Sequence, residues 1–149
     1  MSHTLHLKIV TPERLVLERM VDQVSLPTTQ GEITVLPMHI PLIAGLSSGD
    51  IVAITDGEVV PMAVAGGFVE VKHDEEKNTL VVILADFAEH VAELSDEVVE
   101  RAKARATELN KQRENKEVVD FEHFAVELER SLTRVKIAEK WRTKSRYRK

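Results

Sequence analysis

The sequence predicts an α+β protein in which an N-terminal antiparallel β-sandwich of about ten strands is followed by a C-terminal antiparallel two-helix hairpin. Two observations carry this prediction. All 5 prolines and all 6 glycines lie in the first 67 residues, where short apolar segments alternate with turn residues. Beyond Glu93, helix-forming residues dominate and apolar residues recur at helical spacing. We therefore expect two domains, a sandwich over residues 1–90 and a helix-turn-helix domain over residues 91–149.

The N-terminal part shows the period-2 alternation of half-buried strands. Leu5, Leu7 and Ile9 share one face of the first expected strand. The Asp56-Gly57 pair is typical of a two-residue hairpin, because both central positions of that turn take positive φ. No helical segment separates the strands, which argues against a parallel sheet. Further strands are expected over Leu15–Glu18, Gln23–Pro27, Glu32–Leu36, Asp50–Thr55, Glu58–Ala65, Gly67–His73 and Leu80–Asp86.

Two helices are expected after residue 93. Ser95 and Asp120 are suited to cap them, because their side-chain oxygens can accept N–H groups of the first turn. A two-helix contact buries little apolar surface, so we expect the hairpin to need a further partner and to detach at modest cost. The first apolar stripe is narrow and rich in alanine, with Val99, Ala102, Ala106 and Leu109. The second runs through Phe121, Phe124 or Ala125, Leu128, Leu132, Val135, Ala138 and Trp141.

Charge is distributed unevenly along the chain. The net charge is −5, yet residues 1–94 carry 5 basic and 14 acidic side chains and residues 130–149 carry 9 basic and 1 acidic. A basic terminus on an acidic chain favours an acidic partner. It is equally typical of a solvated helix end, where cations suit the negative pole of the helix dipole. Nucleic-acid binding is not expected, because the rest of the chain is acidic and only Trp141 and Tyr147 in the tail could stack on bases.

The sequence contains no known catalytic motif, so we expect no enzymatic activity. The absence of cysteine excludes disulfides and thiolate metal sites and is typical of a reducing compartment. No apolar run reaches the roughly 20 residues that span a bilayer, and no signal peptide is evident, so a soluble protein is expected. His3 and His6 would point to opposite faces of a strand, so no metal site is expected.

Four stretches of the chain carry a family resemblance. They are GEITVLPMHIPLIAGLSSGDI (Gly31–Ile51), AVAGGFVEV (Ala63–Val71), VVILADFAEH (Val81–His90) and DFEHFAVELERSLTRVKIAEK (residues 120–140). In this order and spacing they resemble the epsilon subunit of bacterial and chloroplast F-type ATP synthases, the counterpart of the mitochondrial delta subunit. The chain departs from the family signature at Met38 and Thr34, where the family commonly has glycine.

The resemblance implies a non-catalytic rotor subunit in the central stalk of a proton-translocating F-type ATP synthase. It implies that the sandwich binds the gamma subunit and the ring of c subunits. It also implies that the C-terminal helices can fold down on the sandwich or extend along gamma to the catalytic beta and alpha subunits, and that the extended form inhibits ATP hydrolysis. The expected location is peripheral, on the cytoplasmic side of the bacterial plasma membrane, with the stromal side of the thylakoid membrane as the alternative.

The resemblance also assigns roles to individual residues. Glu32 and His39 match the signature loop and are candidates for the surface that faces the c-ring. The candidate inhibitory basic helix, which would meet an acidic segment of a beta subunit, contains Arg130, Arg134, Lys136 and Lys140.

A regulatory ATP site is known in some bacterial members, whose motif places Arg-Ala three residues after an aspartate. In this chain Val99 stands three residues after Asp96, and Arg101-Ala102 comes two residues later. The resemblance therefore implies no required cofactor, and an ATP-sensing module acting through the hairpin is the alternative function. Its candidate ATP-binding residues are Asp96, Glu100, Arg101 and Lys103.

Overall fold

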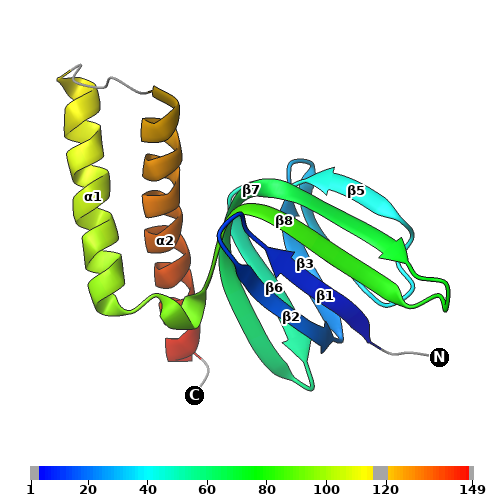
Figure 1. The fold of residues 1–149 in the computed structure, drawn as a ribbon. Coiled ribbons are helices and arrows are strands. Elements are labelled where there is room, and N and C mark those ends of the chain that lie inside the picture. The colour runs from blue at the N-terminus through cyan, green and yellow to red at the C-terminus, as the bar shows by residue number, and fades with distance from the viewer. Residues whose placement is uncertain (1–3, 116–120, 148–149) are drawn as a thin grey trace. The chain divides into compact units, whose positions relative to one another are not determined.

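The computed structural model describes residues 4–115 and 121–147, so the expected helix cap Asp120 lies outside it. The chain divides into two compact units, Met1–His90 and Val91–Lys149. The first unit is a β-sandwich and the second a pair of helices, which confirms the predicted fold class (Figure 1). Within the described residues, neither helix combines the length and the apolar character that a bilayer crossing requires.

Among the described residues, eight strands build the sandwich, in the order β2-β1-β8-β7-β6-β3-β4, with β5 paired to β7. All pairs are antiparallel except β1 with β8, which run parallel. Their chain connection passes through all the other strands, so it is long enough for a parallel pair. The strands are β1 (Leu5–Val10), β2 (Leu15–Val21), β3 (Gln23–Thr28), β4 (Gly31–Val35), β5 (Leu42–Gly45), β6 (Gly49–Thr55), β7 (Glu58–His73) and β8 (Thr79–His90).

The sheet folds over so that the end of β2 meets β6. The Asp22 N–H donates to the Ile54 carbonyl at 2.8 Å, and the Asp56 N–H donates to the Asp22 carboxylate at 2.8 Å. The inward side chains of the folded sheet form one apolar core. The predicted alternation in β1 is confirmed, because its inward residues are fully buried and pack in this core: Leu5, Leu7 and Ile9.

Strand β7 is one reason why the described residues form eight strands rather than about ten. The expected strands Glu58–Ala65 and Gly67–His73 form one strand of 16 residues. Gly66 and Gly67 bend it at φ values of +70° and +113°. A Cβ at position 67 would lie 2.1 Å from the Leu84 carbonyl oxygen, so β8 can approach only a glycine there. The bend lets one long strand take the place of two expected ones.

The second unit contains a short 3-10 helix (Val91–Glu93) and the helices α1 (Asp96–Glu114) and α2 (Phe121–Tyr147), which pack against each other. The Ser95 hydroxyl caps α1 by accepting the Val98 N–H at 3.3 Å, as predicted. The buried stripe of α1 also follows the prediction: Val99, Ala102, Ala106 and Leu109.

The buried face of α2 differs from the expected stripe. Phe124, Ser131 and Ala138 are buried at seven-residue spacing, Thr133 and Ile137 are buried as well, and Phe121 and Leu132 are exposed. A helix that packs on one antiparallel neighbour repeats its buried positions every seven residues, and a serine can occupy such a position where the neighbour is small. The sequence pattern therefore indicated a broad apolar surface, of which only part is buried.

Candidate functional site

The most chemically distinct feature of the helical unit is a groove between α1 and α2. Its volume is about 430 Å³. Small residues at its floor, Ala102 and Ser131, keep the two helices close, while longer side chains form its walls. The walls contain four arginines and one acid: Arg101, Arg105, Arg130, Arg134 and Glu127.

One arginine of the groove is paired across the helices. Arg105 binds Glu127 through two contacts, from Nε to Oε1 at 2.5 Å and from Nη2 to Oε2 at 3.1 Å. These hydrogen bonds hold the pKa of the Glu127 carboxyl below its ordinary value and raise the pKa of Arg105. Both groups therefore stay charged at neutral pH, and α1 is tied to α2.

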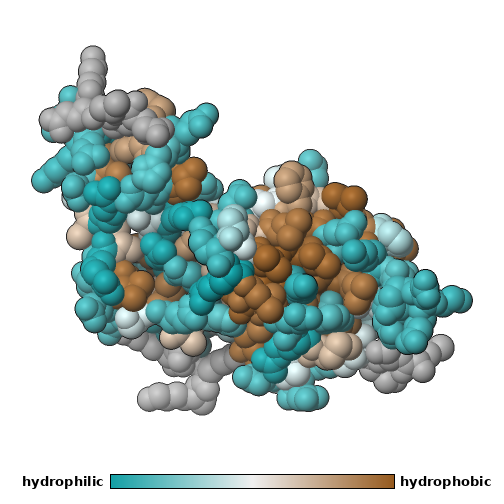
Figure 2. All heavy atoms as spheres, viewed as in Figure 1, coloured by the Kyte–Doolittle hydropathy of each residue, from teal (hydrophilic) through white to brown (hydrophobic). Residues whose placement is uncertain are grey.

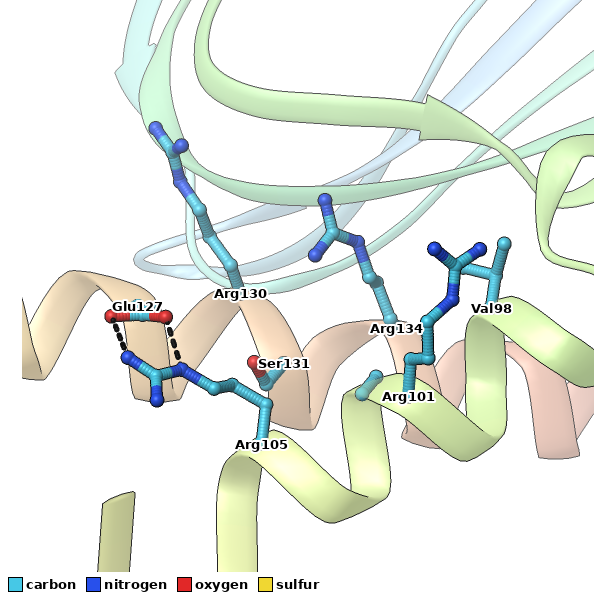
Figure 3. Close-up of a pocket in the computed structure, with 8 residues that line it drawn as sticks. Val98, Arg101, Arg105, Glu127, Arg130, Ser131 and Arg134 are labelled. Atoms are coloured by element: carbon cyan, nitrogen blue, oxygen red, sulfur yellow. Dashed lines mark hydrogen bonds and ion pairs between the residues drawn. The ribbon is translucent and has the colours of Figure 1, made fainter. Parts of the chain in front are cut away.

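The other three arginines give the groove its positive character. Arg101 from α1 and Arg130 and Arg134 from α2 extend toward the same side of the hairpin (Figure 3). The lining of the groove contains four guanidinium groups and one carboxylate, and Arg105 also pairs with Glu108 at 3.0 Å. Planar guanidinium groups bind phosphate or carboxylate oxygens in pairs. The groove is thus chemically suited to a multiply charged anion.

Only one of the expected ATP-binding residues lies in this groove. Arg101 lines it, but Asp96 binds Arg142 of α2. Lys103 lies 3.4 Å from Glu139 and 3.7 Å from Glu100, away from the groove. The other three candidates therefore serve as ion-pair partners on the surface of the hairpin.

The four candidate inhibitory residues divide into two pairs. Arg130 and Arg134 line the groove, whereas Lys136 and Lys140 are exposed and do not line it. At about 100° per residue, the lysine pair lies about 120° around α2 from the arginine pair. The described helix therefore presents two separate basic surfaces rather than one.

Arg105 was not among the expected site residues. A signal existed in the sequence, because Arg101 and Arg105 are four residues apart, as are Arg130 and Arg134. Side chains four apart lie on one helix face, so two such pairs on antiparallel helices can converge. What the sequence alone lacked was the rotation of each helix about its axis.

The two candidates for the ring-facing surface lie in β4 and in the loop that follows it. Glu32 is exposed at the start of β4, opposite Pro27 of β3, and His39 follows the end of β4 in the loop 36–41. The His39 ring donates through Nδ1 to the carbonyl of Ile40 at 2.7 Å. Among the described residues, no hydrogen bond or ion pair joins Glu32 to His39.

The sandwich also exposes an apolar face that sequence reasoning missed. Phe68 of β7 stands opposite Leu84 of β8, and with Ile43 of β5 they are 63%, 57% and 71% exposed. Two hollows of about 380 and 250 Å³ flank the Phe68–Leu84 pair. Figure 2 shows the apolar surface gathered over β7 and β8. We name this surface, formed by Ile43, Phe68 and Leu84, the apolar face.

Comparisons with known proteins agree with the resemblance found in the sequence. Residues 4–91 match the family model described as ATP synthase, Delta/Epsilon chain, beta-sandwich domain. The ATP synthase epsilon chain of Halalkalibacterium halodurans is 40% identical over 91% of this chain and 97% of that protein. The epsilon chain of Nitratidesulfovibrio vulgaris (strain DP4) is 36% identical over 92% of this chain and 97% of that protein.

A solved structure supports the fold independently. A chain in the cryo-EM structure of the Euglena gracilis mitochondrial ATP synthase, OSCP/F1/c-ring in rotational state 1, superposes with a TM-score of 0.62. It is 19% identical, and the match covers 96% of this chain and 82% of that one. Since the family model covers residues 4–91 and the sequence relatives span nearly the whole chain, this chain belongs to the ATP synthase delta/epsilon-chain family.

Proposed function

We propose that this chain is a non-catalytic central-stalk subunit of a proton-translocating F-type ATP synthase and couples the gamma subunit to the c-ring. The observation that carries the proposal is the apolar face, on a chain that epsilon chains match over nearly its whole length. Contiguous exposed apolar surface on a small protein marks a site of interaction with another protein. In this proposal the chain is peripheral to the membrane, on the cytoplasmic side of the bacterial plasma membrane. The stromal side of the thylakoid membrane is the alternative location.

The apolar face suits a partner that supplies apolar anchors. Phe68 and Leu84 stand between the two hollows, so side chains of a partner can enter on either side of them. Acidic groups lie at the rim, with Glu70 beside one hollow and Asp86 beside the other. We therefore expect the facing surface of gamma to carry apolar residues at its centre and basic residues around them.

A substitution within the apolar face tests this assignment. Phe68→Ser is expected to weaken binding of the full chain to its cognate gamma subunit by at least about tenfold, because the residue is a central aromatic anchor. Met20→Ser is the matched control, since Met20 is also exposed but lies on β2, away from the face. Titration calorimetry of the two purified subunits measures the difference. Equal affinities of the Phe68 and Met20 variants would contradict the assignment.

We assign contact with the c-ring to Glu32 and the loop 36–41. Glu32 is exposed and the loop contains exposed Met38 and Ile40, so this part of the sandwich offers both a charge and apolar side chains. The double substitution Glu32→Gln with His39→Ala is expected to weaken co-sedimentation of the chain with detergent-solubilised c-ring while leaving gamma binding unchanged. Loss of both interactions together would point to misfolding instead.

The C-terminal helices act, in this proposal, as a brake on ATP hydrolysis. Phe121 and Leu132 are exposed on α2 and can bind a new partner when the hairpin opens. Lys136 and Lys140 are exposed as well, and they offer a basic surface to an acidic segment of a catalytic beta subunit. Ion pairs between exposed or half-exposed side chains tie α1 to α2, and such pairs are individually weak.

Deletion of residues 120–149 tests the brake. The truncated chain is expected to assemble normally and to raise the ATPase activity of the assembled enzyme. A sharper variant is Lys136→Glu with Lys140→Glu, which reverses the exposed basic surface and leaves the groove arginines in place. If hydrolysis is the same in all three enzymes, the brake is wrong for this chain while the scaffold role stands.

The groove between the helices favours a second candidate function, the sensing of ATP. Guanidinium groups from both helices line the groove and can bind a polyphosphate, and ligand contacts to both helices would favour the closed hairpin. Calorimetry of the full chain with ATP and magnesium tests this function. Sub-millimolar binding that is lost in Arg101→Ala and Arg134→Ala but kept in Arg113→Ala supports it. If ATP does not bind, the sensing function is wrong and the chain serves only as a mechanical rotor subunit.

A further inference from the structure

The loop 36–41 contains a residue in an unfavourable backbone conformation. Met38 has φ of +74°, in the left-handed region that residues with a Cβ adopt at a cost. The loop itself provides a single backbone hydrogen bond, from the His39 N–H to the Leu36 carbonyl at 3.1 Å. Such a conformation persists only where surrounding groups hold it.

Two side chains from outside the loop supply that support. The Met38 N–H donates to the Thr79 hydroxyl oxygen at 2.8 Å. The His73 ring donates through Nε2 to the carbonyl of His39, also at 2.8 Å. These contacts reach across 41 and 34 residues of sequence, so the loop is tied to a distant part of the sandwich.

Thr79 and His73 belong to one structural element. They face each other as the last cross-strand pair of the β7–β8 ladder. Thr79 is only 3% exposed, so its hydroxyl is fixed in place. The turn that joins the two strands is closed by Asp74, whose carboxylate accepts the N–H groups of Glu76 at 2.9 Å and Asn78 at 2.8 Å. The end of the β7–β8 hairpin is therefore a rigid support for the loop.

The loop presents three exposed apolar side chains in alternation. Leu36, Met38 and Ile40 are 51%, 65% and 72% exposed. Holding Met38 in the left-handed conformation fixes the direction in which its side chain leaves the loop. If the hydrogen bond to Thr79 were lost, Met38 would relax toward negative φ and the arrangement of the three side chains would change.

We propose that Thr79 and His73 are positioning residues that hold the loop 36–41 in a preformed shape for docking. The inference rests on the proposed contact of this loop with the c-ring. A preformed loop loses little conformational entropy on binding, so the hydrogen bonds made in the free protein increase the affinity for the partner.

Hydrogen exchange of the Met38 amide in the full chain tests the support directly. Thr79→Val keeps the shape of the side chain and removes the acceptor, so Met38 exchange is expected to be about fivefold to tenfold faster. Thr79→Ser retains the hydroxyl and is expected to match the wild type. An unchanged Met38 exchange rate in Thr79→Val would overturn the proposal, whatever its effect on binding to the c-ring.

The variant Met38→Gly shows whether Thr79 supports the left-handed conformation of residue 38 or only the general stability of the sandwich. Glycine adopts positive φ without strain, so the loop keeps its shape with less help from Thr79. Thr79→Val is therefore expected to accelerate exchange at residue 38 less in the Met38→Gly background than in the wild type. Equal acceleration in both backgrounds would mean that the hydroxyl does not support this conformation.

Co-sedimentation with detergent-solubilised c-ring tests the link to docking. Thr79→Val and His73→Ala are expected to weaken ring binding severalfold, and Thr79→Ser to leave it unchanged. His73 is exposed, so its removal does not endanger folding. The positioning role would be overturned if Thr79→Val accelerated Met38 exchange without weakening binding to the c-ring. This holds provided that the double variant Glu32→Gln with His39→Ala does weaken binding to the c-ring. If that double variant has no effect either, the proposed ring contact itself has failed.

Discussion

The sandwich and the helical hairpin are held together by different forces. The core of the sandwich is built from large aliphatic side chains on β1, β2, β3, β4, β6, β7 and β8, most of them without any solvent exposure. The buried stripe of α1 is narrower, with Ala102 and Ala106 lying between Val99 and Leu109, and α2 buries the small Ser131. Ion pairs that also link the two helices include Asp96 with Arg142, Lys103 with Glu139 and Arg105 with Glu127.

This difference fits the division of labour that we propose. Burial of aliphatic side chains is little affected by salt, whereas ion pairs between exposed groups are screened and contribute roughly 0–1 kcal/mol each. A unit held mainly by a narrow seam and exposed charges opens at a lower free energy than a unit with a large core. The scaffold is therefore expected to be the stable half and the brake the adjustable half.

The largest effect is expected from the core of the sandwich. Ile83→Ala removes a fully buried side chain and is expected to lower the free energy of unfolding by about 2–5 kcal/mol through lost burial and the cavity left behind. Leu84→Ala is the matched control, since this neighbour is exposed and its truncation should cost little. Urea unfolding, together with amide hydrogen exchange in β1 and β8, measures the stability of both variants. A similar decrease in the free energy of unfolding for the two variants would contradict a core that lies on one face of β8 only.

The next effect is expected in the hairpin seam. Ala106→Leu forces a larger side chain between α1 and α2 and is expected to destabilise the hairpin by about 1–3 kcal/mol. Ala104→Leu, on the exposed face of the same helix, is the control. Exchange of α1 amides should accelerate only in the Ala106 variant, while exchange in β8 stays unchanged. Acceleration in both units would mean that their stabilities are not separate.

Local patterns were sufficient to predict most of the fold. The alternation around Leu5 and Ile9 and the alanine-rich stripe through Ala102 identify their buried faces, because the structural period fixes which residues share a face. Strand β5 was missed, since its four residues between Pro41 and Ser47 are too few to show a period. The joining of two expected strands into β7 depends on a close approach between Gly67 and β8, which no local pattern contains.

The candidate site was less predictable, because it depends on tertiary contacts. The four groove arginines come from two helices, and their convergence depends on how each helix is rotated about its axis. The apolar face was missed because Phe68 and Leu84 occur in strands that also have buried apolar residues. Sequence composition does not distinguish an apolar residue on the outer face from one in the core.

A smaller effect is expected from the ion pair between Arg105 and Glu127. Glu127→Gln removes a two-point charged contact between partly exposed groups and is expected to lower the stability of the hairpin by about 0.5–1 kcal/mol. Glu139→Gln removes only the 3.4 Å contact to Lys103 and should cost less. Thermal unfolding followed by circular dichroism, at low and high salt, measures both. The difference between the wild type and Glu127→Gln should shrink at high salt.

The same ion pair predicts how the hairpin responds to acid. The pKa of Glu127 in the folded hairpin lies below its ordinary value of 4.5, first because of the hydrogen bonds from Arg105. The contribution of this carboxylate is therefore fully present above pH 4.5 and is lost as the pH falls through the lower folded pKa. Helix stability measured from pH 7 to pH 3 should fall less steeply in Glu127→Gln than in the wild type.

The smallest effect is expected at the turn of the β7–β8 hairpin, where protonation of Asp74 at low pH removes hydrogen bonds. Hydrogen bonds from Asn78, the backbone N–H first, lower the pKa of the Asp74 carboxyl below 3.8. The turn is therefore held by the carboxylate above pH 3.8 and loses this support only as the pH falls through the lower folded value. Exchange of the Asn78 and Glu76 amides should accelerate below that pH, while β8 stays protected.

Two substitutions complete this test. Asp74→Ala should accelerate exchange of the Asn78 amide even at neutral pH, and Glu75→Gln, at the neighbouring acid, should not. In the hairpin, protonation of a single carboxylate weakens the link between two whole helices. In the sandwich, protonation of Asp74 should loosen only its own turn, because the strands on either side are held by the core. Loss of β8 protection along with the turn would show that the sandwich is also held by its surface charges and would remove the contrast between the two units.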